Sequence, residues 1–224
     1  MRILAGCALF LAFAATSGCH VSLNGLGPGV QGSGLKVTDV RAVPEFTKVR
    51  VRNSANVIIQ IGDEQSVEVE VDDNLVDVIT TDVSGGEMTV SSDGSYSTNL
   101  GVTVRVTVPK LEAASINGSG DITVSGLAAE KFEATVRGSG DIRVVGTATR
   151  IEAKVTGSGD IDLSQLNADT GAAKVTGSGD ISICVSEKLD ARVTGSGDIR
   201  YGGHSGSEPK VDESVTGSGN ISKR

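Results

Sequence analysis

From about residue 111 to the end of the chain, apolar and polar side chains alternate along short segments. Phe132, Ala134 and Val136 form one such segment, and Ile142 and Val144 begin the next. A period of two places every second side chain on the same face, which is typical of a β-strand with one buried face. Each unit is therefore predicted to be a strand, a corner, a second strand and a loop.

A tetrapeptide marks the corner of each unit. Gly-Ser-Gly-Asp occurs five times, and a sixth copy ends in Asn220; the copies are spaced by 20, 19, 20, 18 and 22 residues. A fixed period of this length predicts a solenoid, in which each repeat is one rung stacked on the last. The corner glycines are Gly118, Gly120, Gly138, Gly140, Gly157, Gly159, Gly177, Gly179, Gly195, Gly197, Gly217 and Gly219.

Length variation between the units is confined to one place. The predicted strands and corners keep a constant length, as a parallel stack requires, because a slip of one residue would turn the core face outward. The predicted loops are residues 125–131, 145–150, 164–170, 184–188 and 202–210, with 7, 6, 7, 5 and 9 residues.

Residues 38–110 also read as strands, although without the twenty-residue period. β-branched stretches alternate with turn residues such as Asn53-Ser54 and Gly85-Gly86. Helical periodicity is absent from the sequence after residue 18. We therefore expect an all-β, parallel β-solenoid that the 38–110 region continues or caps, since an uncovered stack exposes a pairing edge.

The N-terminus has the features of an export signal. Met1-Arg2 precedes an apolar stretch that is too short to span a membrane, and Thr16-Ser17-Gly18-Cys19 follows. These residues resemble the lipobox of bacterial lipoproteins, which implies a diacylated Cys19 as the mature N-terminus and anchoring in a membrane. His20 in place of Asp favours the outer membrane of a Gram-negative cell. Thr16 stands where the lipobox usually has leucine, so ordinary signal cleavage is the alternative.

The composition argues against several classes of function. The net charge is −8, or −9 once residues 1–18 and their single charged residue Arg2 are removed, which argues against nucleic acid as a partner. Neither His20 nor His204 lies in a recognisable catalytic or zinc-binding motif. Tryptophan, whose ring commonly stacks on sugars in carbohydrate-binding sites, is absent. We expect no enzyme and no cofactor. Cys184 is predicted to be a small packing residue.

The aspartates of the corners are the candidate site. Stacked strands repeat at about 4.8 Å, and unit charges at that spacing repel by about 0.9 kcal/mol in water or about 3.5 kcal/mol at an effective dielectric constant of 20. Hydrogen bonds to turn amides would relieve the repulsion, as in Asx turns. The alternative is calcium held between rungs, although RTX repeats follow a different motif and a nine-residue period. The aspartates are Asp121, Asp141, Asp160, Asp180 and Asp198.

Several motifs together resemble the head GIN domain family of adhesin-like proteins, also called DUF2807. They are Arg41–Phe46, Asp72–Leu75, Val106–Leu111 and the serial Gly-Ser-Gly-Asp-Ile turns, and the resemblance covers residues 38–224. It implies a right-handed parallel β-solenoid similar to pectin-lyase folds but without their catalytic residues. It also implies export or lipid anchoring. It transfers no functional residue.

These observations predict a non-catalytic, lipid-anchored module of the cell envelope, adhesin-like, with an envelope protein or polysaccharide as partner. A carbohydrate-active enzyme on a β-helix scaffold and a calcium-stabilised envelope scaffold are the alternatives. A concave groove lined by carboxylates and tyrosine would favour the enzyme. A flat, charged stack would favour the non-catalytic envelope module. The expected organisation is a signal peptide (1–18), a lipidated cysteine with a glycine-rich linker (19–37), an N-terminal β region (38–110) and the repeat solenoid (111–224).

Overall fold

A computed structural model describes residues 29–204 and 206–224; the predicted signal peptide and Cys19 lie outside these ranges. The regular secondary structure of the described chain consists of strands and one short 3-10 turn at Asp73–Leu75. No helix within it is long and apolar enough to cross a membrane. The strands are β1 Val30–Gln31, β2 Lys36–Val40, β3 Lys48–Val51, β4 Asn56–Ile61, β5 Ser66–Asp72, β6 Ile79–Ser84, β7 Glu87–Ser92, β8 Tyr96–Ser97, β9 Thr103–Val108, β10 Ala113–Ile116, β11 Ile122–Gly138, β12 Ile142–Gly157, β13 Ile161–Gly177, β14 Ile181–Gly195, β15 Ile199–Gly202, β16 Lys210–Gly217 and β17 Ile221–Lys223.

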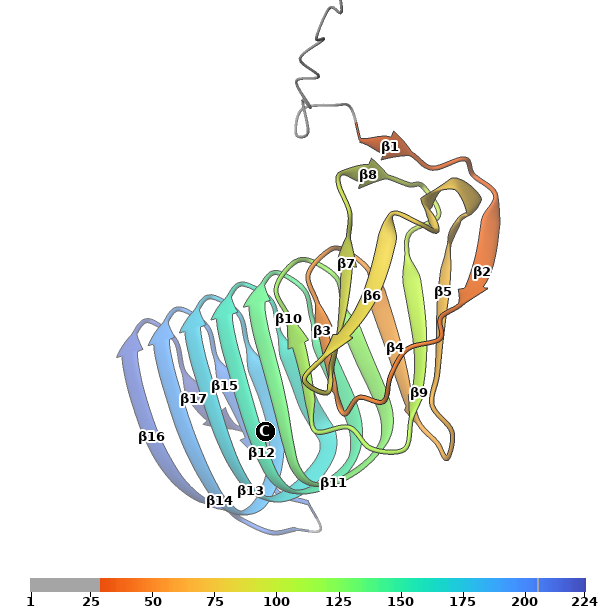
Figure 1. The fold of residues 1–224 in the computed structure, drawn as a ribbon. Coiled ribbons are helices and arrows are strands. Elements are labelled where there is room, and N and C mark those ends of the chain that lie inside the picture. Colours follow the sequence, from red (N-terminus) through yellow and green to blue (C-terminus); the bar gives the residue numbers. More distant parts are fainter. Residues whose placement is uncertain (1–28, 205) are drawn as a thin grey trace, which may run out of the picture.

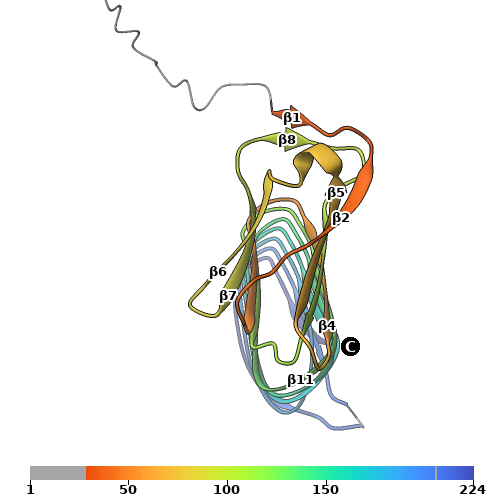
Figure 2. The ribbon, with the colours of Figure 1, turned by 45° about the vertical axis from the view of Figure 1, so that its right-hand side comes forward.

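The repeats stack in parallel and in register, which confirms the predicted β-solenoid (Figure 1). Gly138, Gly157, Gly177, Gly195 and Gly217 are direct partners on successive strands. Seen along the stack, the rungs form a flattened oval (Figure 2). We call the side formed by β7, β3, β10, the later parts of β11–β14 and β16 the first face. The second face consists of β9, β4, the early parts of β11–β14, β15 and β17.

The core lies between the two faces. The alternating aliphatic residues point inward, and Phe132, Val136, Ile142 and Val175 are completely buried. Burial of a large aliphatic side chain stabilises a fold by about 1.5–3 kcal/mol relative to its exposure. Each rung therefore depends on the rungs above and below to cover its apolar edge.

The connections between rungs differ from the prediction. β11 to β14 run as single strands through four of the five predicted loops, and their registers shift at β-bulges. Leu127, Leu166 and Val185 lie in these segments and are buried in the core. A bulge adds a residue to one strand without ending the pairing, so the differences in unit length are absorbed there. Of the five predicted loops, the last is the one in which described residues, 203–204 and 206–209, lie outside the strands.

The N-terminal half both continues and caps the stack. β3 pairs in parallel with β10, and β4 pairs with β11, so residues 48–61 form a further rung. β7 and β9 then pair in parallel on the outer side of β3 and β4. β5 and β6 lie antiparallel on β9 and β7, and β2 covers β5. The change to antiparallel pairing ends the parallel stack at this side.

The folded domain begins earlier than the boundary expected at residue 38. β1 pairs with β8, and the amide of Gly34 donates a hydrogen bond to Asp72 Oδ1 at 2.6 Å. The side chain of Asp72 is buried and also accepts a hydrogen bond from Thr98. Part of the glycine-rich segment that composition assigned to a linker is therefore attached to the cap.

Candidate functional site

The Gly-Ser-Gly corners are tied together by backbone hydrogen bonds between rungs. The carbonyl of Gly157 accepts from the amides of Ser178 and Gly179, at 2.9 and 3.2 Å, and the pattern repeats along the stack. A Cβ on Gly159 would lie 2.1 Å from the carbonyl oxygen of Gly140, which is far inside contact distance. Gly157 has a φ of 131° and the same close approach to Gly138. Glycine is thus required because the backbones of successive rungs touch here.

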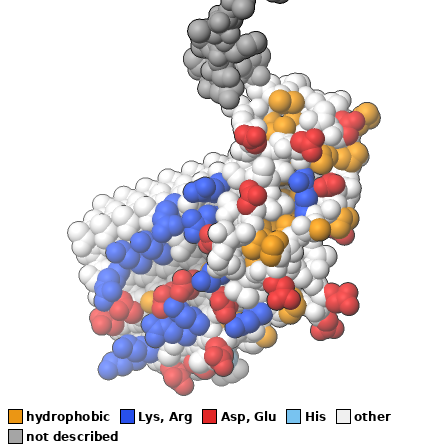
Figure 3. All heavy atoms as spheres, viewed as in Figure 1, with side chains coloured by type: hydrophobic (Ala, Val, Ile, Leu, Met, Phe, Trp, Pro, Cys, Tyr) orange, Lys and Arg blue, Asp and Glu red, His pale blue; other side chains and the backbone are white. Residues whose placement is uncertain are grey.

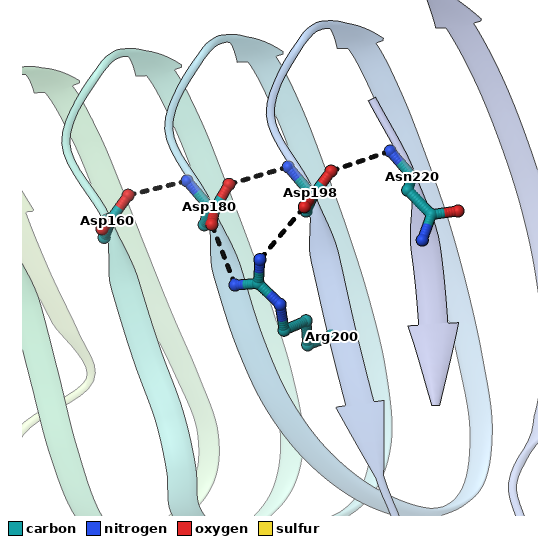
Figure 4. A network of polar contacts seen from close by, with 5 residues as sticks. All are labelled: Asp160, Asp180, Asp198, Arg200 and Asn220. Atoms are coloured by element: carbon teal, nitrogen blue, oxygen red, sulfur yellow. Dashed lines mark hydrogen bonds and ion pairs between the residues drawn. The ribbon is translucent and has the colours of Figure 1, made fainter. Parts of the chain in front are cut away.

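The corner aspartates form a continuous ladder of hydrogen bonds. Oδ1 of Asp160 accepts from the backbone amide of Asp180 at 2.7 Å, and Asp180 accepts from Asp198 in the same way at 2.8 Å (Figure 4). The amides therefore come from the next rung, whereas an Asx turn would use the aspartate's own corner. Asn220 ends the ladder, and its backbone amide donates a hydrogen bond to Asp198 Oδ1.

One arginine neutralises the C-terminal part of this ladder. Arg200 bridges the second oxygens of Asp180 and Asp198, at 2.9 and 3.0 Å (Figure 4). The hydrogen bond to Asp180 raises the pKa of Arg200 above its usual value. Within the described ranges, no group of three or more His, Cys, Asp or Glu side chains is placed to hold a metal ion. Calcium binding by these aspartates stays a prediction.

The first face carries three rows of exposed charges (Figure 3). The acidic row consists of Glu133, Glu152, Asp190 and Asp212 on successive strands, with Ala172 between them. The basic row beside it consists of Lys154, Lys174 and Arg192. An outer basic row lies in the segments predicted to be loops, so the period-two alternation gave no signal for it. Its members are Lys131, Arg150, Lys188 and Lys210.

Ion pairs engage some of the charges on the first face and leave others without a partner. Lys131 lies 2.6 Å from Glu133 and 3.3 Å from Glu152, and Arg150 also contacts Glu152. The acidic row is thus partly neutralised from the outer side. Lys154 and Lys174 are exposed and form no ion pair or hydrogen bond within the described chain. The face therefore presents cations that have no carboxylate partner.

A hollow of about 870 Å³ lies on the same face above β10. The hollow forms because β10 turns only the small side chains of Ala113 and Ser115 outward, between long side chains on β3 and β11. A second hollow, of about 330 Å³, is centred on Ala172 and shares Glu133 and Thr135 with the first. The two hollows are therefore neighbours along the stack, and together we call them the trough.

In the larger hollow, most of the acidic side chains also form ion pairs. Glu87 accepts from Arg50 at 2.9 Å, and Glu112 contacts Lys110 at 2.7 Å. The contact with Lys110, followed by the hydrogen bond from Thr47, lowers the pKa of Glu112. The exposed Arg137 has no ion pair or hydrogen bond in the described chain.

Four side-chain polar atoms in this part of the stack lack partners, and two of them belong to residues that line this hollow, Arg50 and Ser115. Arg50 Nε, Asn53 Nδ2, Ser115 Oγ and Asn117 Oδ1 are shielded from solvent and make no hydrogen bond in the described structure. All four belong to β3, β10 and the corners that follow them. Buried polar groups are nearly always satisfied, so such a concentration points to water or a ligand at this place.

The structure does not join the predicted aspartate ladder to the trough. The aspartates lie at the corner that precedes the second face, next to a hollow of about 350 Å³ that also contains Arg143 and Arg200. The trough depends on the pairing of β10 with β3, which brings Ala113 and Lys48 together across the sequence. Sequence periodicity offered no signal for that contact.

Comparison with solved structures finds the same architecture in bacterial proteins. A "putative adhesin" from Bacteroides fragilis NCTC 9343 is 25% identical with a TM-score of 0.72, and the match covers 88% of this chain and 100% of that one. A "putative adhesin" and a "putative lipid binding protein" from Parabacteroides distasonis ATCC 8503 have identities of 23% and 20% and TM-scores of 0.56 and 0.57, with the same coverage. These two likenesses show the fold alone. No curated protein sequence matches the chain.

A family model described as "Putative auto-transporter adhesin, head GIN domain" matches residues 45–205, from the segment just before β3 into the last predicted loop. This range includes the trough and the whole aspartate ladder. The family and its structural neighbours are described as adhesins or binding proteins and not as enzymes. The chain therefore belongs to the head GIN domain family, DUF2807.

Proposed function

We propose that this protein is a non-catalytic binding module of the cell envelope that holds an envelope polysaccharide or protein on its first face. The observation that carries the proposal is the trough, which continues along a rigid parallel stack beside unpaired Lys154, Lys174 and Arg137. The strands are hydrogen-bonded on both sides, so these side chains are held on a surface that need not order itself on binding. The adhesin description of the family and of the Bacteroides fragilis relative agrees with this role.

The trough is poorly suited to glycoside hydrolysis. A general acid in such an enzyme needs a raised pKa, whereas the contact with Lys110 lowers the pKa of Glu112. Tyr96 borders a different hollow near the cap, and Tyr201 packs against the core. A concave surface with carboxylates and tyrosine, expected for the enzyme alternative, is thus not assembled among the described residues.

Export and anchoring complete the proposal. Cys19 would carry the lipid, and residues 19–28 would connect it to a domain that is already paired at Val30. The membrane partner is then reached through the lipid, with the outer membrane as the expected location in a Gram-negative cell. Mass spectrometry of the mature protein should find a diacylated N-terminal Cys19. An unmodified N-terminus produced by cleavage elsewhere would contradict the anchor.

Binding is tested with the full chain purified in detergent, applied to an array of bacterial and host polysaccharides and extracellular-matrix proteins. We expect saturable retention on at least one surface, without release of ligand fragments. Ala172→Trp should reduce it because the indole fills the trough. Thr123→Trp, at an exposed position on the second face, is the matched control and should bind normally. Retention on no surface, or equal loss in both variants, would contradict the proposal.

A further inference from the structure

We infer that the trough takes an anionic polysaccharide, a polymer whose sugar units each carry a carboxylate, lying along the stack and across the strands. This inference rests on the proposed function and specifies the ligand class for the same surface. It is carried by three features of the first face: the unpaired cations, the spacing of Lys154 and Lys174, and the partly exposed Arg50 at one end of the trough.

The unpaired charges favour an anion. Arg137, Lys154 and Lys174 are exposed and have no ion pair within the described chain, whereas Glu133 and Glu152 are engaged by Lys131. The chain as a whole carries a net charge of −8, so these cations are a local exception. A ligand with carboxylates would supply partners for these three cations, and Asp190, Glu87 and Glu112 on the same face are already paired with Arg192, Arg50 and Lys110.

The spacing favours a polysaccharide over an acidic peptide. Lys154 and Lys174 occupy aligned positions on neighbouring strands, which are about 4.8 Å apart. Arg192, the next residue in this row, is already paired with Asp190 at 3.0 Å. One sugar unit is of comparable length, so successive carboxylates of a polyuronate recur along its axis at about the spacing of the strands. In an extended peptide, side chains on the same side recur at about 6.7 Å and fall out of step with the strands.

The end of the trough supplies hydrogen-bonding groups. Arg50 and Ser115 are register partners on β3 and β10, and both contribute a lining side chain with an unsatisfied polar atom. The Arg50 side chain is 32% exposed, so sugar hydroxyl and carboxylate oxygens can accept from N–H groups of its guanidinium other than the shielded Nε. The apolar lining consists of alanines and Pro109, so no pocket is present there for a large apolar side chain.

The test is calorimetric titration of the full chain in detergent with polygalacturonate oligomers, with neutral galactan oligomers of equal length and with poly-glutamate, all in chelator. We expect saturable binding of polygalacturonate that weakens as salt is added, because the contacts are between exposed charges. Lys154→Glu with Lys174→Glu should lower the affinity at least tenfold. Lys188→Glu with Lys210→Glu makes the same charge change on the outer basic row of the same face and should stay within twofold. Melting curves establish that all variants are folded.

Other outcomes overturn the inference. Equal loss in both double variants would mean general attraction of a polyanion, and equal binding of galactan or poly-glutamate would refute the ligand class. If polygalacturonate is not bound while the array still finds a ligand that Ala172→Trp blocks, the inference fails and the proposed function stands. If nothing is bound in either experiment, both fail.

Discussion

At the scale of single residues, the second glycine of each corner is set by contact between backbones. Gly159→Ala would place a methyl group 2.1 Å from the carbonyl oxygen of Gly140, and neither backbone can move without breaking the rung hydrogen bonds. We expect a loss of about 4 kcal/mol or more in the free energy of unfolding, measured by denaturant titration. Ser158→Ala, at the exposed neighbouring position, should change it by less than about 0.5 kcal/mol. A mild effect at Gly159 would mean that the rungs are further apart than described.

The aspartate ladder leads to a prediction that separates a hydrogen-bonding role from a charge role. Oδ1 of Asp141 accepts the amide of Asp160, and an asparagine keeps that acceptor while removing a like charge from the column. Asp141→Ala should therefore cost about 1 kcal/mol, or about 2–4 °C in melting temperature, whereas Asp141→Asn should melt at or above the parent. Asp180→Asn is the contrast, because it loses the contact with Arg200 and should gain nothing. If Asp141→Asn were as damaging as Asp141→Ala, the negative charge itself would be required.

If the negative charge of the ladder is required because it binds calcium, a melting curve measures that directly. Each ladder oxygen Oδ1 already accepts an amide, and Arg200 occupies the second oxygens of Asp180 and Asp198, so few oxygens remain for an ion that takes six to eight. We expect the melting temperature of the full chain to be the same in millimolar calcium and in chelator. A calcium-dependent rise that is abolished by Asp121→Asn with Asp141→Asn would instead establish a metal site in the ladder.

At the scale of elements, the register of the strands can be tested with one buried position and its neighbour. Val175 is completely buried between rungs, so Val175→Asp would place an unpaired charge in the core and should abolish the cooperative melt. Lys174→Asp is the control because its side chain is exposed between Lys154 and Arg192 on the neighbouring strands. Circular dichroism melts of both variants measure the difference. A cooperative melt of Val175→Asp near the parent temperature would refute this register.

The strands and corners were predictable because period-two alternation and a glycine motif are local signals. The prediction failed where a bulge interrupts the alternation: Leu127 and Leu166 are buried, yet their neighbours break the period of two. The trough could not be predicted, since it arises where Ala113 and Ser115 fall between residues that are distant in sequence, such as Arg50 and Arg137. Outward-facing small residues acquire meaning only when their strand neighbours are known.

At the scale of the whole molecule, the two ends of the stack are unequal. The N-terminal end is covered by antiparallel strands, whereas β16 and β17 are each paired on one side only. Val215 lies at an inward position of β16 and is still 44% exposed, while its partner Val193 is 2% exposed. In a solenoid each rung is stabilised mainly by its neighbours, so a rung with one neighbour should open first.

Hydrogen exchange followed by mass spectrometry measures this directly. Amides of β16 and β17 should exchange fastest, those of β14 and β15 more slowly, and those of β12 and β13 slowest, because the central rungs open only when a neighbour has opened. The amides of β9 should resemble the central rungs, since β5 covers their outer side. Equal protection of β16 and β12 would contradict sequential opening. It would mean that the stack unfolds as one cooperative unit or that another surface covers its C-terminal end.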